Sequence, residues 1–182
     1  MKYGIISDTH ITHKDGSEKI KSIIRQLQKV FKNVDEILHA GDVIEPFFLN
    51  ELNKIAPVKC VAGEEDSNTN LEKFIKFSRG SINIGVIHEL PENLEEFIRK
   101  EGVQILITGH THVHIIENKP YNLLILNPGS VTYPKAPPEV KGFKKPMARP
   151  SVITLNIDEN DIISTFLINL PISHDNNWDK NK

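Results

Sequence analysis

The sequence predicts an α/β fold in which two mixed β-sheets pack together and helices cover their outer faces. In the first half of the chain, short apolar segments alternate with segments of helical period, which is typical of parallel βαβ units. In the second half, short apolar segments follow one another between turn residues, with few helical patterns among them. A βαβ half followed by a β-rich half fits two stacked sheets with helices outside.

The first half contains three expected strands, over residues 3–7, 36–40 and 58–62, with a helix after each of the first two. The first helix begins at Ser17, whose side chain can cap the first turn, and its apolar residues recur at helical spacing as far as Phe31. The second helix has Pro46 near its first turn, a position that proline favours.

The second half is expected to hold a β-hairpin, one helix and a series of short strands. The hairpin turns at Arg79-Gly80, and the helix covers residues 92–100. The expected strands cover residues 73–77, 81–88, 103–108, 113–117, 122–126, 151–157 and 162–168. A loop rich in proline and lysine lies between Tyr133 and Pro150.

The composition of the chain narrows the class of protein. Its 182 residues suit a single domain, expected over residues 1–170 and followed by a polar, flexible tail over residues 171–182. The 22 Lys and Arg nearly balance the 24 Asp and Glu, which gives no general attraction to nucleic acid or acidic membranes. Cys60 is the sole cysteine, which excludes an internal disulfide and a thiolate-rich zinc site. No apolar run approaches the ~20 residues that span a bilayer, so we expect a soluble, cytoplasmic protein.

Acidic and histidine side chains follow the expected strands, each just past the end of an apolar run. Seven of them are candidate metal ligands: Asp8, His10, Asp42, Glu64, His88, His110 and His112. In open α/β sheets the carboxyl ends of the strands form the edge where ligands bind. Imidazole and carboxylate without thiolate suit divalent Mn, Fe, Co or Zn, and so many donors exceed what one ion normally takes. The pattern therefore favours two ions that share a bridging carboxylate.

Two ions in such a site are suited to phosphoester hydrolysis. Two metals ~3.5–4 Å apart clamp the attacking and leaving oxygens of an in-line displacement at phosphorus, and a water between them ionises near neutral pH. The resulting hydroxide needs no Ser or Cys nucleophile. Each motif by itself is weak evidence, because an Asp-x-His or Gly-Asp pair also occurs in ordinary loops. Their joint occurrence after successive strands is far more specific.

A set of motifs carries a resemblance to a known family: Asp8-Thr-His10, Gly41-Asp42, Gly63-Glu-Glu-Asp66, His88 and Gly109-His-Thr-His112. Together they resemble the signature of the calcineurin-like metallophosphoesterases. The compact size and Asn127-Pro-Gly-Ser130 are similar to the small prokaryotic phosphodiesterase branch, which also contains the retromer subunit of this fold. The resemblance runs from Lys2 to about Leu170 and implies a four-layer α-β-β-α sandwich.

The resemblance implies a role for each ligand. Asp42 would bridge two ions, the first held by Asp8, His10 and His112 and the second by Glu64, His88 and His110. The predicted catalytic residues are Asp42, Asp66 and His110, with Asp66 orienting a ligand histidine. The family implies two divalent metal ions, of which Mn is preferred here, with Zn, Fe, Co and Ni as alternatives.

Three glutamates depart from the family pattern. Glu64 stands where the family has Asn, and it adds a negative charge and a longer arm while still offering an oxygen. Three carboxylates then face the four positive charges of two divalent ions, so we expect tighter cation binding but a weaker Lewis acid. Glu89 stands where the family usually has Gly. Glu65 stands where many larger members keep a His that protonates the leaving group.

The loop between Tyr133 and Arg149 carries five cations against one acid. Such a cluster is usually a solvated surface. This one follows the Asn-Pro-Gly-Ser turn beside the expected metal site, and its prolines limit the conformations it must give up on ordering. We predict a flap that attracts an anionic substrate, with Arg149, Lys135 and Lys144 as substrate-binding residues.

The predicted function is a dinuclear metal-dependent phosphodiesterase that hydrolyses a small phosphoester by attack of a metal-bridging hydroxide. The alternative is a retromer-like protein-binding scaffold with an altered metal site, which Glu64 and Glu89 favour and the intact His and Asp ligands oppose. A specific nuclease is a weaker interpretation, because the composition suggests no extended basic surface. The sequence leaves open whether the protein forms an oligomer. His39 and Cys60 lie inside apolar strands and are expected to be packed core residues.

Overall fold

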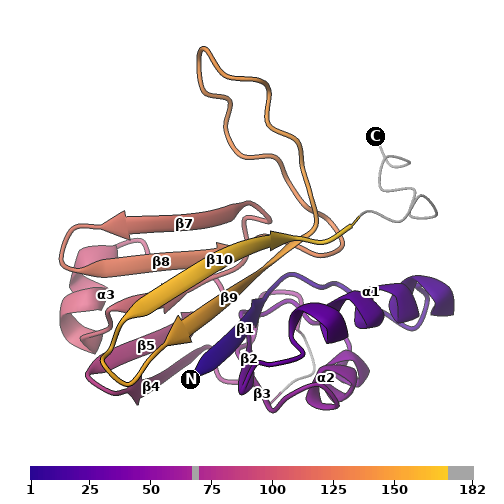
Figure 1. Cartoon of the computed structure of the whole chain (residues 1–182), viewed down its shortest axis with the longest axis horizontal. Helices are drawn as coiled ribbons and strands as arrows, with labels where there is room; N and C mark the ends of the chain where they lie inside the picture. The colour runs from indigo at the N-terminus through magenta and orange to yellow at the C-terminus, as the bar shows by residue number, and fades with distance from the viewer. Residues whose placement is uncertain (67–69, 172–182) are drawn as a thin grey trace.

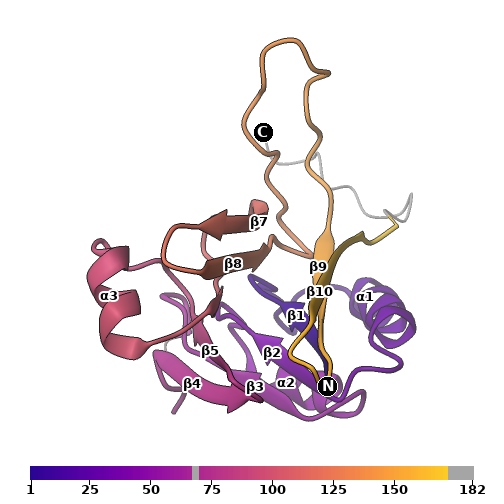
Figure 2. The same ribbon diagram turned by 60° about the vertical axis from the view of Figure 1, so that its left-hand side comes forward.

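The structure is a computed structural model that describes residues 1–66 and 70–171. The predicted polar tail therefore lies outside the described residues, apart from Pro171. Within the described residues, ten strands form two five-stranded sheets and three helices lie on the outer faces, as Figures 1 and 2 show. This arrangement confirms the predicted fold of two packed mixed sheets with helices outside.

The first sheet brings the start of the chain beside its later strands, in the order β10-β9-β1-β2-β3. Its strands are β1 (Lys2–Ile6), β2 (Glu36–His39), β3 (Val58–Cys60), β9 (Ser151–Ile157) and β10 (Ile163–Asn169). β1, β2 and β3 are parallel, whereas β9 is antiparallel to both β1 and β10. The helices α1 (Ser17–Val30) and α2 (Pro46–Asn53) connect the parallel strands, as βαβ units require.

The second sheet has the order β4-β5-β6-β8-β7. Its strands are β4 (Phe74–Arg79), β5 (Ile82–Ile87), β6 (Ile105–Ile107), β7 (His114–Lys119) and β8 (Leu123–Pro128). β4 and β5 form the predicted hairpin, and β5, β6 and β8 run parallel to one another. The helix α3 (Leu94–Glu101) connects β5 to β6.

Apolar side chains fill the space between the sheets and the space under each helix layer. Ile5 of the first sheet packs in one cluster with Ile84 of the second. Side chains alternate along a strand, so the next residue, Ile6, points to the opposite face and shares a cluster with Leu27 of α1. Ile98 of α3 belongs to a third cluster, on the outer face of the second sheet. The four layers of the predicted sandwich are therefore each packed on the next.

Two residues expected in the core lie there in the structure. His39 in β2 and Cys60 in β3 are both buried. Burial, with the charge of Asp66, raises the pKa of the Cys60 thiol to about 12, so this side chain stays protonated as a small apolar residue.

The start of α1 differs from the prediction. Ser17 is the first helical residue, Gly16 holds the cap position, and no side chain caps this helix. Because the backbone of Ser17 is already helical, its hydroxyl lies one position past the site from which a capping hydrogen bond is made. The start of α3 is capped, since the Asn93 side chain accepts a hydrogen bond from the backbone N–H of Glu96.

Residues 133–149, here called the arm, leave the body of the molecule between β8 and β9 (Figures 1 and 2). The side chains of Phe143 and Met147 on the arm are exposed. In the described part of the chain, no helix has the length and apolar character needed to cross a membrane.

Candidate metal centre

The seven side chains predicted as ligands come together in two neighbouring groups. Asp8, His10 and His112 form the first group, and Glu64, His88 and His110 form the second. In each group, one potential ligand atom from each residue lies within 4.8 Å of the others. Asp42 joins Asp8 and His88 in a third such set. The structure therefore brings together every residue of the predicted ligand set.

Asp42 lies between the two groups. One oxygen of its carboxylate, Oδ2, is 3.7 Å from His10 Nε2 and 3.4 Å from His88 Nε2. Burial would raise the pKa of this carboxyl, but the contacts with His88 and with the Glu65 amide outweigh it and lower the pKa. Asp42 is therefore an ionised carboxylate that faces one histidine from each group.

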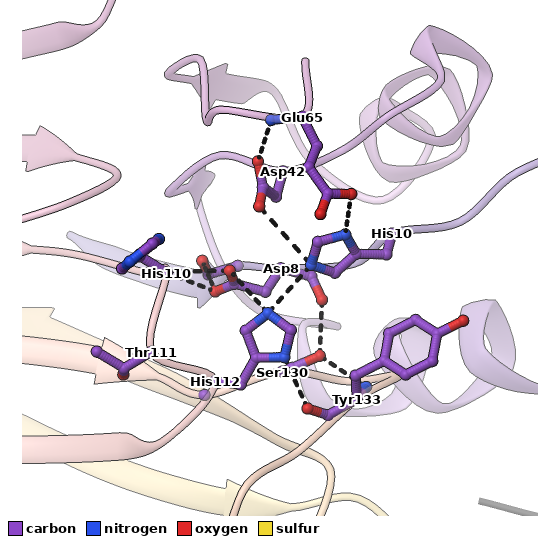
Figure 3. A network of polar contacts seen from close by, with 12 residues as sticks. Asp8, His10, Asp42, Glu65, His110, Thr111, His112, Ser130 and Tyr133 are labelled. Carbon is purple, nitrogen blue, oxygen red and sulfur yellow. Dashed lines mark hydrogen bonds and ion pairs between the residues drawn. The ribbon is translucent and has the colours of Figure 1, made fainter. Parts of the chain in front are cut away.

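In the first group, three ligand atoms converge on one point (Figure 3). His112 Nε2 lies 3.1 Å from His10 Nε2 and 3.4 Å from Asp8 Oδ1. The Asp8 side chain is fully buried, and this burial raises the pKa of its carboxyl. A cation held between these atoms would favour the ionised carboxylate and offset the cost of its burial.

In the second group, two buried ring nitrogens have no hydrogen-bond partner among the described residues: His88 Nε2 and His110 Nδ1. Both face Glu64, whose carboxylate oxygens lie 3.3 Å from His88 Nε2 and 2.8 Å from His110 Nδ1. Burial would lower the pKa of His88, but Asp42, the Ala40 carbonyl and Asp8 raise it to about 9. Two buried ring nitrogens that face carboxylates without a satisfied hydrogen bond, and a negative surrounding that raises the pKa of His88, fit a site for a divalent cation.

The backbone of the ligand loops is strained. Five of the ligands, although not glycine, have a positive φ: Asp8 (49°), His10 (44°), Asp42 (57°), His110 (68°) and His112 (60°). Such conformations persist only where surrounding contacts hold them, and they cluster at functional sites. Here the backbone N–H of Asp8 donates to the Gly41 carbonyl at 3.0 Å, and the Ser130 hydroxyl donates to the Asp8 carbonyl at 2.7 Å.

Two glycines allow the loops to approach one another this closely. A Cβ on Gly63 would lie 2.1 Å from Asp42 Oδ1, and a Cβ on Gly109 would lie 1.9 Å from the Ser7 hydroxyl. Any side chain at either position would displace Asp42 or the residue preceding Asp8. The glycines of these two motifs are therefore required by the packing of the ligands.

Asp66 contacts the backbone of the loop that carries Asp42. Its carboxylate accepts hydrogen bonds from the backbone N–H groups of Asp42 (2.9 Å), Val43 (2.9 Å), Ile44 (2.8 Å) and Gly63 (2.8 Å). A carboxylate that accepts from these four amides holds the backbone of the Asp42 loop. Asp66 is therefore placed to anchor the backbone of Asp42.

The turn from Asn127 to Ser130 lies beside the ligands, as the resemblance implies. The Asn127 amide donates to the Gly109 carbonyl at 2.7 Å, and Ser130 holds the Asp8 backbone. Gly129 has a φ of 74°, and its Cβ position would lie 3.3 Å from the His112 carbonyl. The turn therefore contacts the backbone of Asp8 and of His112, two residues of the first ligand group.

The base of the arm contacts the site through backbone atoms. The Tyr133 carbonyl lies 2.8 Å from His112 Nδ1, and the backbone N–H of Lys135 donates to the His112 carbonyl at 3.0 Å. Arg149 lines a hollow of about 340 Å³ together with His114, Pro137, Lys145, Pro146, Met147 and Asn169. Lys144 is exposed on the arm. Sequence patterns did not indicate the contact between Tyr133 and His112, because a backbone carbonyl carries no residue-type signal.

Two mixed sheets packed face to face, with paired His and carboxylate groups at their strand ends, define a metal-binding α/β sandwich. The chain belongs to the calcineurin-like phosphoesterase superfamily, whose domain matches residues 1–158. This confirms the predicted resemblance. The family is one of metal-dependent phosphoesterases, and it implies divalent metal ions at the groups described above.

Two archaeal relatives support this membership. A probable metallophosphoesterase of Methanothermobacter thermautotrophicus is 34% identical over 166 residues, which cover 87% of each chain. Another, of Methanocaldococcus jannaschii, is 37% identical over 144 residues, which cover 75% of this chain and 71% of that one.

Solved structures share the fold. A predicted phosphoesterase from Streptococcus pneumoniae matches with a TM-score of 0.69 and 19% identity, over 92% of this chain and 88% of that one. The zinc complex of Vps29 from Entamoeba histolytica matches with a TM-score of 0.68 and 23% identity, over 93% and 99% of the two chains. An archaeal phosphodiesterase matches with a TM-score of 0.64 and 22% identity, over 92% and 100%. At these identities the likeness shows the fold alone.

Proposed function

We propose that this chain is a dinuclear metal-dependent phosphodiesterase that hydrolyses a small phosphoester with ionised water as the nucleophile. The observation that carries the proposal is the position of Asp42. One oxygen of its carboxylate lies 3.7 Å from His10 Nε2, in the first ligand group, and 3.4 Å from His88 Nε2, in the second. A ligand shared by two ions needs this placement between two complete ligand groups.

The ligands set the charge of the proposed site. Divalent cations, when bound there, would supply Lewis acidity and would ionise water near neutral pH. Asp8, Asp42 and Glu64 offer three negative charges against the four positive charges of two such cations, and the ionised water supplies a fourth, so the proposed site is neutral and does not repel a phosphoester anion. Manganese is the proposed metal, with Zn, Fe, Co and Ni as alternatives, because the donors are carboxylate and imidazole without thiolate.

The side chains around the site favour water over a protein nucleophile. The hydroxyl of Ser7 donates to the Asp8 carboxylate, and the hydroxyl of Ser130 donates to the Asp8 carbonyl. Cys60 is buried with a pKa of about 12, so its thiolate is not formed at neutral pH. Engaged hydroxyls and a protonated thiol leave ionised water as the nucleophile of the proposed reaction.

The proposed substrate is a small phosphodiester of the cytoplasm, attracted by the cations of the arm. Lys135 lies at the base of the arm, where its backbone contacts His112. Arg149 lies in a hollow with Lys145 and His114, and Arg149 is the proposed forked contact to a phosphate. The archaeal phosphodiesterase of the same fold supports the choice of a diester.

A retromer-like protein-binding scaffold is the second candidate. The Vps29 structures of the same fold and the Glu64 departure favour it. The convergence of all seven ligand side chains, held by loops with strained backbone, supports the enzyme more strongly, because strained backbone conformations cluster at functional sites.

Metal binding and turnover, measured together, test the proposal. Metal-free protein is titrated with Mn²⁺, and hydrolysis of bis(4-nitrophenyl) phosphate is followed at each metal concentration. We expect two ions per chain and metal-dependent turnover. Asp42→Ala should lose at least one ion and nearly all turnover with an unchanged circular dichroism spectrum. Asp158→Ala is the control: this side chain binds the amides of Asn160 and Ile162 in the turn between β9 and β10, so the variant should keep the metal content and turnover of the parent.

The same experiment contains the results that would overturn the proposal. An Asp42→Ala variant that keeps its turnover and its metal content contradicts the dinuclear site. A parent protein that binds neither ion and hydrolyses no phosphoester supports the scaffold instead.

A further inference from the structure

The four ligand histidines share one arrangement: each presents one ring nitrogen to the centre and turns the other toward an oxygen of the protein. For His88 and His112 that oxygen is a backbone carbonyl. His88 Nδ1 lies 2.6 Å from the Ala40 carbonyl, and His112 Nδ1 lies 2.8 Å from the Tyr133 carbonyl.

For the other two histidines the oxygen belongs to a carboxylate. His10 Nδ1 lies at hydrogen-bond distance, 3.2 Å, from Glu65 Oε2 (Figure 3), and His110 Nε2 lies at the longer ion-pair distance of 3.7 Å from Glu89 Oε1. His10 is in the first ligand group and His110 is in the second. Each group therefore contains one histidine with a carbonyl partner and one with a carboxylate partner.

We propose that Glu65 and Glu89 are positioning residues of the metal centre, Glu65 acting through His10 on the first ion and Glu89 acting through His110 on the second. The inference rests on the proposed dinuclear site and extends it to two residues outside the ligand set. Neither residue touches the substrate or the reacting atoms in this proposal.

The chemistry of imidazole supports these roles. A neutral ring has one N–H and one lone pair, and an acceptor beside one nitrogen keeps the proton there. With its proton on Nδ1, facing Glu65, His10 turns the lone pair of Nε2 toward the space that Asp42 Oδ2 and His112 Nε2 also face, where a cation would bind. A carboxylate partner also makes the ring a better ligand, and losing such a partner typically weakens metal affinity 10–100-fold.

The ring of His110 is turned the other way. Its Nδ1 is the buried nitrogen that faces Glu64, so its Nε2 is the nitrogen that faces Glu89. The two carboxylates thus flank one ring, one from the side of the metal and one from the opposite side. Glu64 is placed as a ligand and Glu89 as its outer counterpart.

The backbone of Glu65 adds a second link to the site. Its N–H donates to Asp42 Oδ1 at 3.1 Å, so one residue contacts both the bridging carboxylate and a histidine of the first group. Substituting the side chain leaves this N–H in place. A variant at Glu65 therefore removes the side-chain carboxylate and its histidine contact while the link to Asp42 remains.

Both side chains are exposed, with 58% of Glu65 and 67% of Glu89 accessible to solvent. At such positions a general electrostatic effect on a bound cation is weakened by water and salt. A removed charge and a removed histidine contact can therefore be separated by a control. Glu92 is an equally charged, exposed residue three positions after Glu89 and serves this purpose.

The experiment measures Mn²⁺ affinity at each site, by electron paramagnetic resonance of the free ion, for the full-length parent and for alanine and glutamine variants. We expect Glu65→Ala to weaken the first ion by 10–100-fold, Glu89→Ala to weaken the second by less because its contact is a longer ion pair, and the double variant to weaken both. Glu65→Gln and Glu89→Gln keep an oxygen acceptor and should lose less than the alanine variants. Glu92→Ala should stay within about twofold of the parent, because it removes only a screened charge.

A second measurement reports on the ring itself. In zinc-loaded protein, nitrogen-15 NMR of the histidine rings should show a protonated Nδ1 for His10 in the parent and in Glu65→Gln, with faster proton exchange in Glu65→Ala. Unfolding curves of the metal-free variants should match the parent, since both side chains are on the surface.

The results distinguish a failure of this inference from a failure of the proposed function. If the parent binds two ions and both alanine variants bind them as tightly as Glu92→Ala does, the inference is wrong while the proposed function stands. If the parent binds fewer than two ions, the proposed dinuclear site itself is wrong.

Discussion

The carboxylate of Asp66 accepts a hydrogen bond from the backbone N–H of Asp42 at 2.9 Å and thereby holds the residue that lies between the two ligand groups. The same carboxylate also binds the next two amides and that of Gly63. Asp42 and Ile44 both have a positive φ, so this carboxylate stabilises a backbone that would otherwise relax.

The first prediction concerns this anchor. Asp66→Asn keeps the shape of the side chain but points an NH₂ group at amide donors. We expect a loss of about 1–3 kcal/mol in the free energy of unfolding, because buried donors lose their acceptor. Mn²⁺ binding should weaken as well, because Asp42 moves.

Urea unfolding and Mn²⁺ titration of the same preparations check this. Asp15→Asn is the control, since Asp15 accepts from the Thr12 amide at 3.0 Å and pairs with Lys19 outside the ligand groups. It should bind Mn²⁺ as the parent does. Unchanged stability and metal affinity in Asp66→Asn would mean that the anchor is dispensable.

The second prediction concerns Glu64, which lies 2.8 Å from His110 Nδ1 and 3.3 Å from His88 Nε2. Glu64→Asn restores the neutral residue of the family. Binding of the second ion should weaken, because one negative charge is lost. Turnover at saturating metal should equal or exceed that of the parent, since fewer carboxylates leave the cations stronger Lewis acids.

Metal titration and saturating-metal kinetics measure the two effects separately. Glu64→Gln keeps the length of the side chain and removes only the charge, so it separates charge from reach. A Glu64→Asn variant with the metal affinity of the parent would show that Glu64 is not a ligand.

The candidate ligands could be predicted from the sequence because each one follows the end of a strand within five residues. A run such as Gly4 to Ile6 has the apolar character of a strand packed on both faces, and Asp8 comes directly past its end. Parallel strands place their carboxyl ends at one edge, so the order of strand and ligand along the chain already predicts convergence. The fold class follows from the same alternation.

The contacts that orient these ligands could not be predicted in the same way. His10 meets Glu65 and His112 meets Tyr133 because loops that are far apart in the chain approach one another. No local period encodes such an approach. Asp66 shows the same limit: its residue type indicated a role in the site, but only the structure shows that its partners are backbone amides.

The third prediction concerns the arm. Neutralising four of its cations, with Lys141, Lys144, Lys145 and Arg149 changed to Gln, should raise KM for the anionic diester and flatten its salt dependence. Electrostatic attraction of this kind is screened over about 8 Å at physiological salt, so the effect should be largest at low salt. The amount of bound metal should not change.

Steady-state kinetics at low and high salt test this. The control changes four exposed cations away from the arm: Lys29, Lys32, Lys54 and Lys100. It alters the net charge of the protein equally and should leave KM nearly unchanged. If the arm variant has the KM of the parent at low salt, the arm is a solvated surface.

The fourth prediction concerns His39 and the acid stability of the fold. His39 is fully buried, its Nε2 lies 3.2 Å from the Thr9 hydroxyl, and its Nδ1 has no partner among the described residues. Burial, together with the charge of His88, lowers the pKa of His39 to about 3. In the unfolded chain the pKa of a histidine is about 6.5, so between these values only the unfolded chain binds the proton.

His39 therefore contributes stability that is fully present above about pH 6.5 and is lost as the pH falls toward 3, at up to about 1.4 kcal/mol for each pH unit. His39→Gln cannot take up this proton. It should be less stable than the parent at pH 7 because it loses a packed ring, and the difference should shrink by about 1–2 kcal/mol at pH 5. Urea unfolding at the two pH values, in the presence of a chelator, measures this difference. His13→Gln, at a histidine whose side chain is 76% exposed, should lose stability with pH as the parent does. An equal gap between His39→Gln and the parent at both pH values would mean that His39 binds a proton as readily in the folded chain as in the unfolded one.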